Sequence, residues 1–310
     1  MKERTQLIIR LISTHIVLIP VLIFTSLIVN RDSFLLPAIT QTALLIIYLS
    51  GYWEFPGLRI RWSYCLSIEF LLLIVLFRKI FSQAGETNCY LIIALSLLQA
   101  YLLIRLIRII IVIFRRDKDS FEIVFPFRQG KYMVTDGGNS RISRLMNYHF
   151  FSPVHKKNKT NLSMLFATDI VKINNFKSNF LPLQNEDYPV FGEKVYSPTG
   201  GLVVKVVDKI EDNIPYVGNY PYNTGNTVVI QKDNRYMLIG HLKMNSVKVR
   251  TGDYVNAGDM IAEAGNSGYS ERPHIHMQLI ESATDNYWKG VGVSIQFRKK
   301  NLYKNRVIDV

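Results

Sequence analysis

Four long apolar segments fill the N-terminal third of this chain of 310 residues and constrain its fold more than any other feature. Each is near or above the ~20 residues that a helix needs to cross the hydrocarbon core of a bilayer. Short polar stretches separate them, and four such runs in succession are unusual in a soluble core. The segments are 7–29, 34–53, 62–81 and 89–114. We therefore expect a membrane-embedded bundle of four α-helices over residues 1–114.

A few polar residues interrupt these apolar segments. Glu69, Arg105 and Arg108 would be costly inside a membrane, where charges are often functional. If the third and fourth segments form an antiparallel hairpin, Glu69 lies within about two helical turns of Arg105. An ion pair, or arginines that extend to the interface, then explains them better than a transport pathway. Cys65 and Cys89 form no disulfide framework and do not indicate the redox compartment.

The rest of the chain alternates short apolar runs with glycines and polar turns, which is typical of antiparallel β-structure. We expect a linker over 115–125 and an all-β domain over 126–310, long enough for one hydrophobic core. Gly-Asp pairs at 252–253 and 258–259 mark tight turns between strands. Lipoyl- and biotinyl-carrier domains share this rhythm, but neither turn has the exposed acceptor lysine that a carrier needs.

Five of the six histidines lie in this second region. His274 and His276 stand two residues apart in a run that suits a β-strand, so both imidazoles are expected on one face and Ile275 on the other. Imidazole is the commonest metal-ligating side chain. Two exposed polar positions on a half-buried strand explain such a pair at least as often. The remaining histidines therefore decide between the two readings: His149, His155 and His241.

Asp169 lies inside the apolar run 165–171, where an unpaired carboxylate would be expensive to bury. A salt bridge to Lys172 is the simplest explanation. The number of histidines in this region favours a metal site instead.

The segment 132–279 resembles the lysostaphin/LytM-type zinc metallopeptidases, which mostly cut the peptide cross-links of bacterial cell walls. The resemblance covers roughly half of the chain, and its ordered motifs are far more specific together than any one alone. The motifs are Gly-Gly-Asn at 137–139, Asn-Tyr-His at 147–149, Ala-Thr-Asp-Ile-Val-Lys at 167–172, and the stretches 192–198, 201–204, 225–230, 240–242, 249–261, 265–268 and 273–276.

This resemblance implies that zinc is bound by His149, Asp169 and His276, with His241 and His274 as catalytic residues beside it. A catalytic zinc takes three nitrogen or oxygen ligands and keeps a position for water. The two further histidines would take a proton and stabilise the oxyanion. His149 and Asp169 are farther apart than in the family, with a basic insertion between them. His155 therefore stays open as the first ligand, although the Asn-Tyr-His context favours His149.

We accordingly predict a membrane-anchored zinc metalloendopeptidase that hydrolyses the peptide cross-links of bacterial peptidoglycan. One alternative is a catalytically silent module that binds the wall or regulates another protein. Retention of all five site residues argues against it, because silent relatives usually lose ligands. Another is a membrane protease that processes a peptide or bacteriocin precursor.

The net charge of +13 predicts anionic surroundings. Basic runs at 115–118 and 298–306 suit lipid headgroups or an anionic wall polymer. No nucleic-acid motif accompanies the charge, so no nucleic-acid partner is expected. We expect a multi-pass protein of the cell membrane whose catalytic domain faces outward. Lysines and arginines beside the segments favour the cytoplasmic side instead, so the sequence leaves the sidedness open, along with the oligomeric state and the bond cut.

Overall fold

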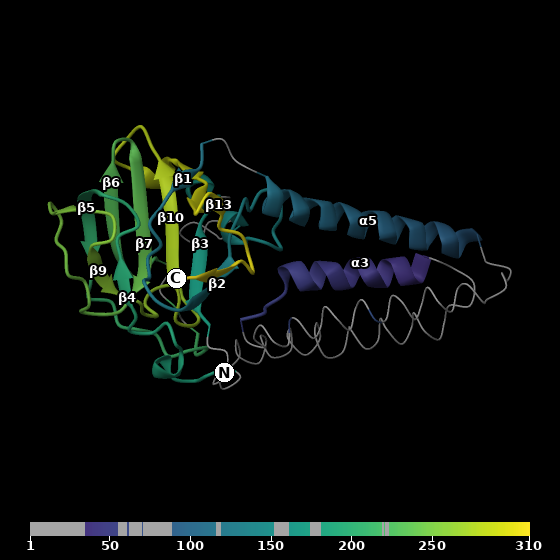
Figure 1. Cartoon of the computed structure of the whole chain (residues 1–310), viewed down its shortest axis with the longest axis horizontal. Helices are drawn as coiled ribbons and strands as arrows, with labels where there is room; N and C mark the ends of the chain where they lie inside the picture. Colours follow the sequence, from purple (N-terminus) through teal and green to yellow (C-terminus); the bar gives the residue numbers. More distant parts are fainter. Residues whose placement is uncertain are drawn as a thin grey trace. The chain divides into compact units, whose positions relative to one another are not determined.

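The computed structural model describes residues 35–54, 61, 70, 89–115, 119–151, 161–173, 181–218, 220 and 223–310. These residues fall into two compact units, one within Thr5–Ile111 and the other within Val112–Val310 (Figure 1). The first unit is helical and the second is built from strands. The predicted segment 7–29, nearly all of 62–81, and Glu69, Cys65 and His155 lie outside the described residues.

Two helices are described in the first unit, α3 (Leu35–Ser50) and α5 (Cys89–Phe114). By length and composition α5 is the one described helix that is long and apolar enough to cross a membrane. Only 11% of its most apolar window is buried, whereas a soluble core helix would be mostly covered. The described part of the chain thus supports one candidate span, and a four-helix bundle is not shown. Within α5, Arg105 donates a hydrogen bond to the hydroxyl of Tyr101 at 2.6 Å.

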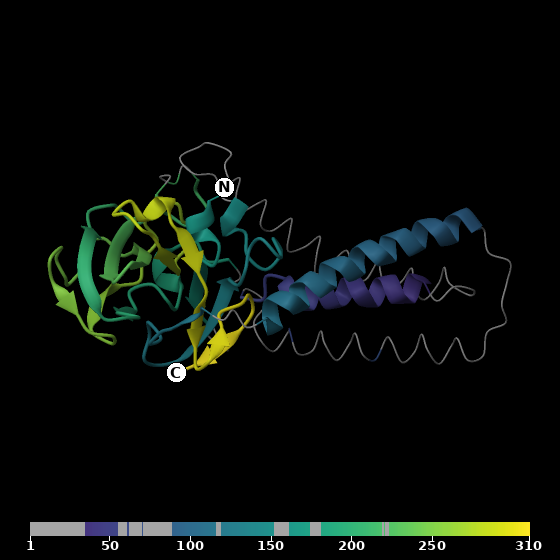
Figure 2. The ribbon, with the colours of Figure 1, turned by 90° about the horizontal axis from the view of Figure 1, so that it is seen from above.

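The second unit has a main antiparallel sheet of nine strands, as the all-β prediction requires. Along the sheet the order is β14-β2-β3-β10-β7-β6-β5-β8, and β11 pairs with β10. Figure 1 shows β6, β7, β10 and β3 side by side, and Figure 2 shows the same layer from above. The strands are β2 (Lys131–Asp136), β3 (Thr168–Lys172), β5 (Gly201–Val207), β6 (Asn226–Lys232), β7 (Arg235–Leu242), β8 (Tyr254–Val255), β10 (Ile275–Glu281), β11 (Val291–Val293) and β14 (Val307–Asp309).

Two small sheets and four short 3₁₀ helices make up the rest of the described secondary structure of this unit. One sheet contains β1 (Phe121–Glu122), β12 (Ile295–Phe297) and β13 (Lys300–Asn301), and the other pairs β4 (Lys194–Tyr196) with β9 (Met260–Glu263). The 3₁₀ helices are η2 (His149–Phe151), η3 (Leu162–Met164), η4 (Asn185–Asp187) and η5 (Tyr287–Lys289).

The start of the β unit lies inside the stretch expected to be a linker. β1 pairs in parallel with β12, and both Ile123 and Phe125 are buried in the main core. The partner strand lies some 170 residues further along the chain, so local sequence gives no sign of this pairing. The linker boundaries and the domain boundaries remain a prediction.

Strand alternation places apolar and polar side chains of β10 on opposite faces of the sheet. Ile275, Met277 and Leu279 belong to the main hydrophobic core. His276 and Gln278, between them, are buried polar residues outside that core. The core thus fixes the register of β10, because a slip of one residue would exchange the two faces.

Candidate metal centre and active site

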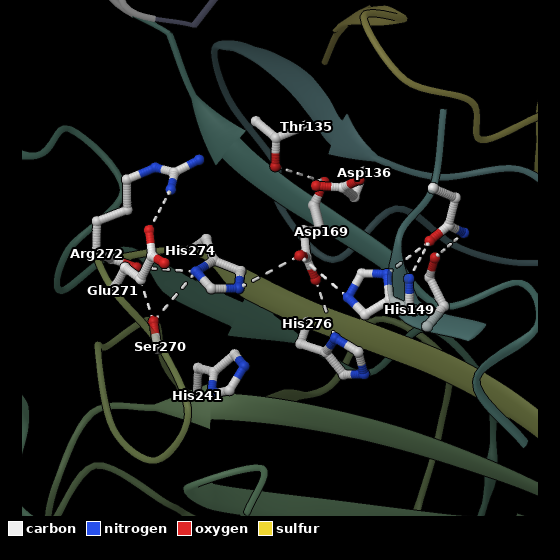
Figure 3. Close-up of polar contacts among 12 residues, drawn as sticks. Thr135, Asp136, His149, Asp169, His241, Ser270, Glu271, Arg272, His274 and His276 are labelled. Atoms are coloured by element: carbon white, nitrogen blue, oxygen red, sulfur yellow. Dashed lines mark hydrogen bonds and ion pairs between the residues drawn. The ribbon is translucent and has the colours of Figure 1, made fainter. Parts of the chain in front are cut away.

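Five side chains from distant parts of the sequence meet beside the middle of the main sheet. His149 lies in η2, Asp169 in β3, His276 in β10 and His241 near the end of β7, while His274 directly precedes β10. In Figure 3 the rings of His149, His274 and His276 surround the carboxylate of Asp169, and His241 lies beside them. The structure therefore brings together all five residues that the resemblance indicated.

Asp169 contacts three of the histidines through its two carboxylate oxygens. Its Oδ1 is 2.9 Å from Nδ1 of His276. Its Oδ2 is 3.2 Å from Nε2 of His149 and 3.6 Å from Nε2 of His274. One ligand atom each from His149, Asp169 and His276 lies within 4.8 Å of the others, close enough for one metal ion.

The salt bridge that offered a simpler explanation of Asp169 does not form. Lys172 instead contacts the carboxylate of Glu193. Asp169 and Lys172 are three residues apart in one strand, so their side chains project from opposite faces of the sheet. The burial of Asp169 is therefore offset by histidines and not by the lysine.

Pairing of β10 with β3 places the two strand-borne residues opposite each other. His276 is in register with Asp169, and Ile275 with Ile170. The two isoleucines pack in the core, so the histidine and the aspartate share the other face. Hydrophobic patterning of both strands thus positions two of the three candidate ligands.

His149 reaches the same point from a loop, and a buried amide holds it there. The side-chain oxygen of Asn147 accepts a hydrogen bond from the backbone N–H of His149 and lies 2.7 Å from its Nδ1. The amide nitrogen of Asn147 donates to the carbonyls of Gly138 and Ala167. This clamp keeps His149 beside Asp169 despite the twenty residues between them. His155, the alternative first ligand, lies outside the described residues.

Sequence reasoning gave no role to Gln278, which is fully buried next to the site. Its side-chain oxygen lies 3.0 Å from Nε2 of His276. The available signal was its spacing, since position 278 follows His276 by two residues and therefore shares its face of the strand.

His241 and His274 present one ring nitrogen each to backbone carbonyls. Nδ1 of His241 is 2.7 Å from the carbonyl of Ser267, and Nδ1 of His274 is 2.8 Å from that of Arg272. A carbonyl only accepts, so each Nδ1 carries the proton and each Nε2 keeps its lone pair. His241 has a positive φ of 59°, a left-handed conformation uncommon outside glycine that is found at functional positions.

Electrostatics acts in opposite directions on His149 and on the pair His241 and His274. Burial would lower the pKa of His149, but the carboxylate of Asp169 outweighs it and raises that pKa. Burial would raise the pKa of Asp169, yet His149 and His274, by their charge, and hydrogen bonds from His149 and His276 hold it well below its usual range. Burial lowers the pKa of His274 and, with His274 and His276 nearby, holds that of His241 well below its ordinary value. His241 and His274 are thus neutral at neutral pH.

The donor set fits zinc better than a hard cation. Two imidazoles and one carboxylate are the nitrogen and oxygen ligands of catalytic zinc sites, whereas calcium and magnesium prefer oxygen alone. Three protein ligands leave a position for water or substrate.

Comparisons with known proteins give the same family as the motifs. Residues 187–287 match the family described as Peptidase family M23. The chain is 37% identical over 89 residues to peptidoglycan DD-endopeptidase ShyA of Vibrio cholerae, covering 29% of this chain and 18% of that protein. It is 31% identical over 65 residues to lysostaphin of Staphylococcus simulans, covering 21% and 13%. A solved zinc containing peptidase from Vibrio cholerae has a TM-score of 0.31 at 22% identity, covering 54% of this chain and 37% of that one.

The β unit is therefore similar to the M23 peptidases over residues 187–287, in agreement with that part of the resemblance. The matched segments span less than a fifth of the length of these curated relatives. His241, His274 and His276 lie within the matched residues, whereas His149 and Asp169 precede them.

Proposed function

We propose that this chain is a membrane-anchored zinc metalloendopeptidase that hydrolyses peptide cross-links of bacterial peptidoglycan. The observation that carries the proposal is the cluster of His149, Asp169 and His276, whose ligand atoms lie within 4.8 Å of one another. The names of the relatives, a peptidoglycan DD-endopeptidase and lysostaphin, support the substrate class.

In this proposal His149, Asp169 and His276 hold the zinc. When bound, zinc polarises the scissile carbonyl and lowers the pKa of a water molecule toward ~7. Asp169 supplies the negative charge of the site, and its low pKa keeps it ionised over the physiological range.

His241 and His274 then handle the proton and the developing negative charge. Both are neutral with a free lone pair on Nε2, so either is able to accept a proton from the attacking water. Once protonated, the same nitrogen donates to the oxyanion or to the leaving amine. Their rings are 4.7 Å apart, so both serve one reacting centre.

Anchoring rests on α5, with the remaining predicted spans completing a multi-pass anchor. The outward side suits a wall substrate. A second candidate function, the processing of a peptide or bacteriocin precursor, is favoured by the basic residues Arg59, Arg61 and Arg115, which indicate a cytoplasmic β unit. Accessibility of a cysteine introduced at the C-terminus to an impermeant reagent on intact cells separates the two sides.

The function is tested with the full chain purified in detergent. We expect about one equivalent of zinc and new amino termini in cross-linked muropeptides, detected by mass spectrometry. His276→Ala should abolish both, while His15→Ala, in the first apolar segment, should abolish neither. A zinc-loaded protein that cleaves peptide precursors but no muropeptide would favour the second candidate. A folded chain that binds no zinc would contradict the proposal.

A further inference from the structure

Apart from the contacts with Asp169, the ring nitrogens of the four histidines have partners of two different kinds. Those of His241 and His274 face backbone carbonyls. Those of His149 and His276 face side-chain amides, from Asn147 and Gln278 respectively. Both amides are completely buried, and both come from residues two positions from the histidine that they contact. The two histidines that are candidate metal ligands are thus the two whose ring orientation depends on a neighbouring side chain, which a substitution can remove.

The orientation of the Asn147 amide is fixed by its own hydrogen bonds. Its nitrogen lies between two carbonyl oxygens, Gly138 O at 2.7 Å and Ala167 O at 2.8 Å, and only the NH₂ group is able to donate to both. The oxygen must therefore face His149. Nδ1 of His149 consequently donates to that oxygen, and Nε2 is the ring nitrogen that faces Asp169.

The amide of Gln278 has the corresponding role at His276, but fewer hydrogen bonds fix its orientation. Its oxygen faces Nε2 of His276, so Nδ1 is the ring nitrogen that faces Asp169. Its buried amide nitrogen has no hydrogen-bond partner among the residues that the structure describes. With zinc bound, Nδ1 would offer its lone pair to the metal, so Nε2 would carry the proton and residue 278 would accept it. A carboxylate at position 278 only accepts, so it would exclude the reversed orientation, in which the amide of Gln278 donates to Nε2.

We propose that Asn147 and Gln278 are positioning residues that turn opposite ring nitrogens, Nε2 of His149 and Nδ1 of His276, toward a single metal position beside Asp169. This inference rests on the proposed zinc function. Neutral amides orient the rings without the negative charge of a carboxylate partner, which would raise the basicity of the ligand. The bound zinc therefore keeps more of its electrophilic character.

The test measures zinc affinity of the full chain in detergent by competition with a chromophoric chelator. Gln278→Leu, which fills the space without an acceptor, should bind zinc ~10–100-fold more weakly. Gln278→Glu, which only accepts, should bind at least as tightly as wild type while hydrolysing substrate more slowly. Asn147→Ala should also weaken binding ~10–100-fold. Asn161→Ala is the matched control, because Asn161 is buried and caps η3 through Ser163 without touching any of the five site residues.

A second readout reports the hydrogen bonds directly. With ¹⁵N-labelled histidine in the zinc-loaded chain, the N–H protons of His149 Nδ1 and His276 Nε2 should exchange slowly with solvent. Gln278→Leu should shift and speed the exchange of the His276 proton alone. This measurement holds for Gln278 even if the Asn147 variant does not fold.

The possible failures are distinct. If wild type binds no zinc, the proposed function fails. If wild type binds zinc and Gln278→Leu binds it within about twofold as tightly, the positioning role is wrong while the function stands. Gln278→Glu behaving like Gln278→Leu would show that packing, and not hydrogen-bond acceptance, is what residue 278 provides.

Discussion

Helix α5 and strand β10 are both rich in apolar residues, yet their polar side chains find partners at very different distances along the chain. α5 is apolar on all sides and largely exposed, and its Arg105 bonds to a tyrosine one turn away. β10 buries His276 and Gln278 by joining them to each other and to Asp169, 107 residues away in the sequence. A helix satisfies its backbone locally, whereas a strand acquires partners from distant segments. The candidate site residues are therefore brought together at the sheet.

Loss of the central carboxylate is the largest effect we expect in the β unit. Asp169→Ala removes the group that holds three histidine rings in place and supplies the negative charge of the site. Zinc binding and hydrolysis should both fall to background, as measured by metal analysis and muropeptide cleavage. His155→Ala should leave both unchanged. Loss of zinc in His155→Ala but not in His149→Ala would make His155 the first ligand.

Removal of a single proton-handling histidine should have a smaller and more selective effect. His274→Ala and His241→Ala should retain zinc, because three ligands remain, but lose ~10²-fold or more in kcat. Zinc content and turnover measured on the same preparations separate catalysis from binding. Undiminished turnover in both variants would place the proton transfer on another group.

Acid should destabilise the metal-free β unit through its buried neutral histidines. Folding lowers the pKa of His241 and that of His274. Below about pH 6.5 the unfolded chain therefore binds protons at these residues that the folded chain does not bind. Each such group lowers the free energy of unfolding by at most about 1.4 kcal/mol per pH unit. His149 acts oppositely, since its raised pKa contributes stability that is full below about pH 6.5 and lost as the pH rises.

Urea unfolding with a chelator present, at several pH values from 7.5 down to 5, measures this dependence. His241→Gln should flatten it, because glutamine does not titrate. An unchanged slope would mean that His241 takes up its proton equally in both states.

The smallest effect we expect is that of removing the helical region. A chain that begins at residue 119, just before β1, keeps every site residue and should hydrolyse soluble muropeptides at a rate within about threefold of the full chain. On whole cells it should act more slowly, because the anchor raises the local concentration near the wall. A truncated chain that folds and binds zinc but is inert on soluble substrate would show that the helices shape the site.

The resemblance to the family and the five candidate site residues came from the sequence because both depend on short motifs. Alternation in Ile275–Glu281 predicts that His274 and His276 share a face and that Ile275 is buried opposite, and the structure has this arrangement. The role of Gln278 was missed because a glutamine in a buried strand has no sequence signature of its own. The span over 7–29 and nearly all of 62–81 lie outside the described residues, so the helical bundle stays a prediction.

The sequence by itself determined the division into apolar helix-forming and β-forming regions, since residue periodicity and segment length are local properties. Only the tertiary structure decided which atoms meet: that Lys172 pairs with Glu193, that Phe121–Glu122 joins the β unit, and that Asn147 holds His149 beside Asp169. The physical reason is that a side-chain hydrogen bond depends on register and loop closure between distant segments. Both are fixed by how the whole core packs, and no short stretch of sequence encodes them.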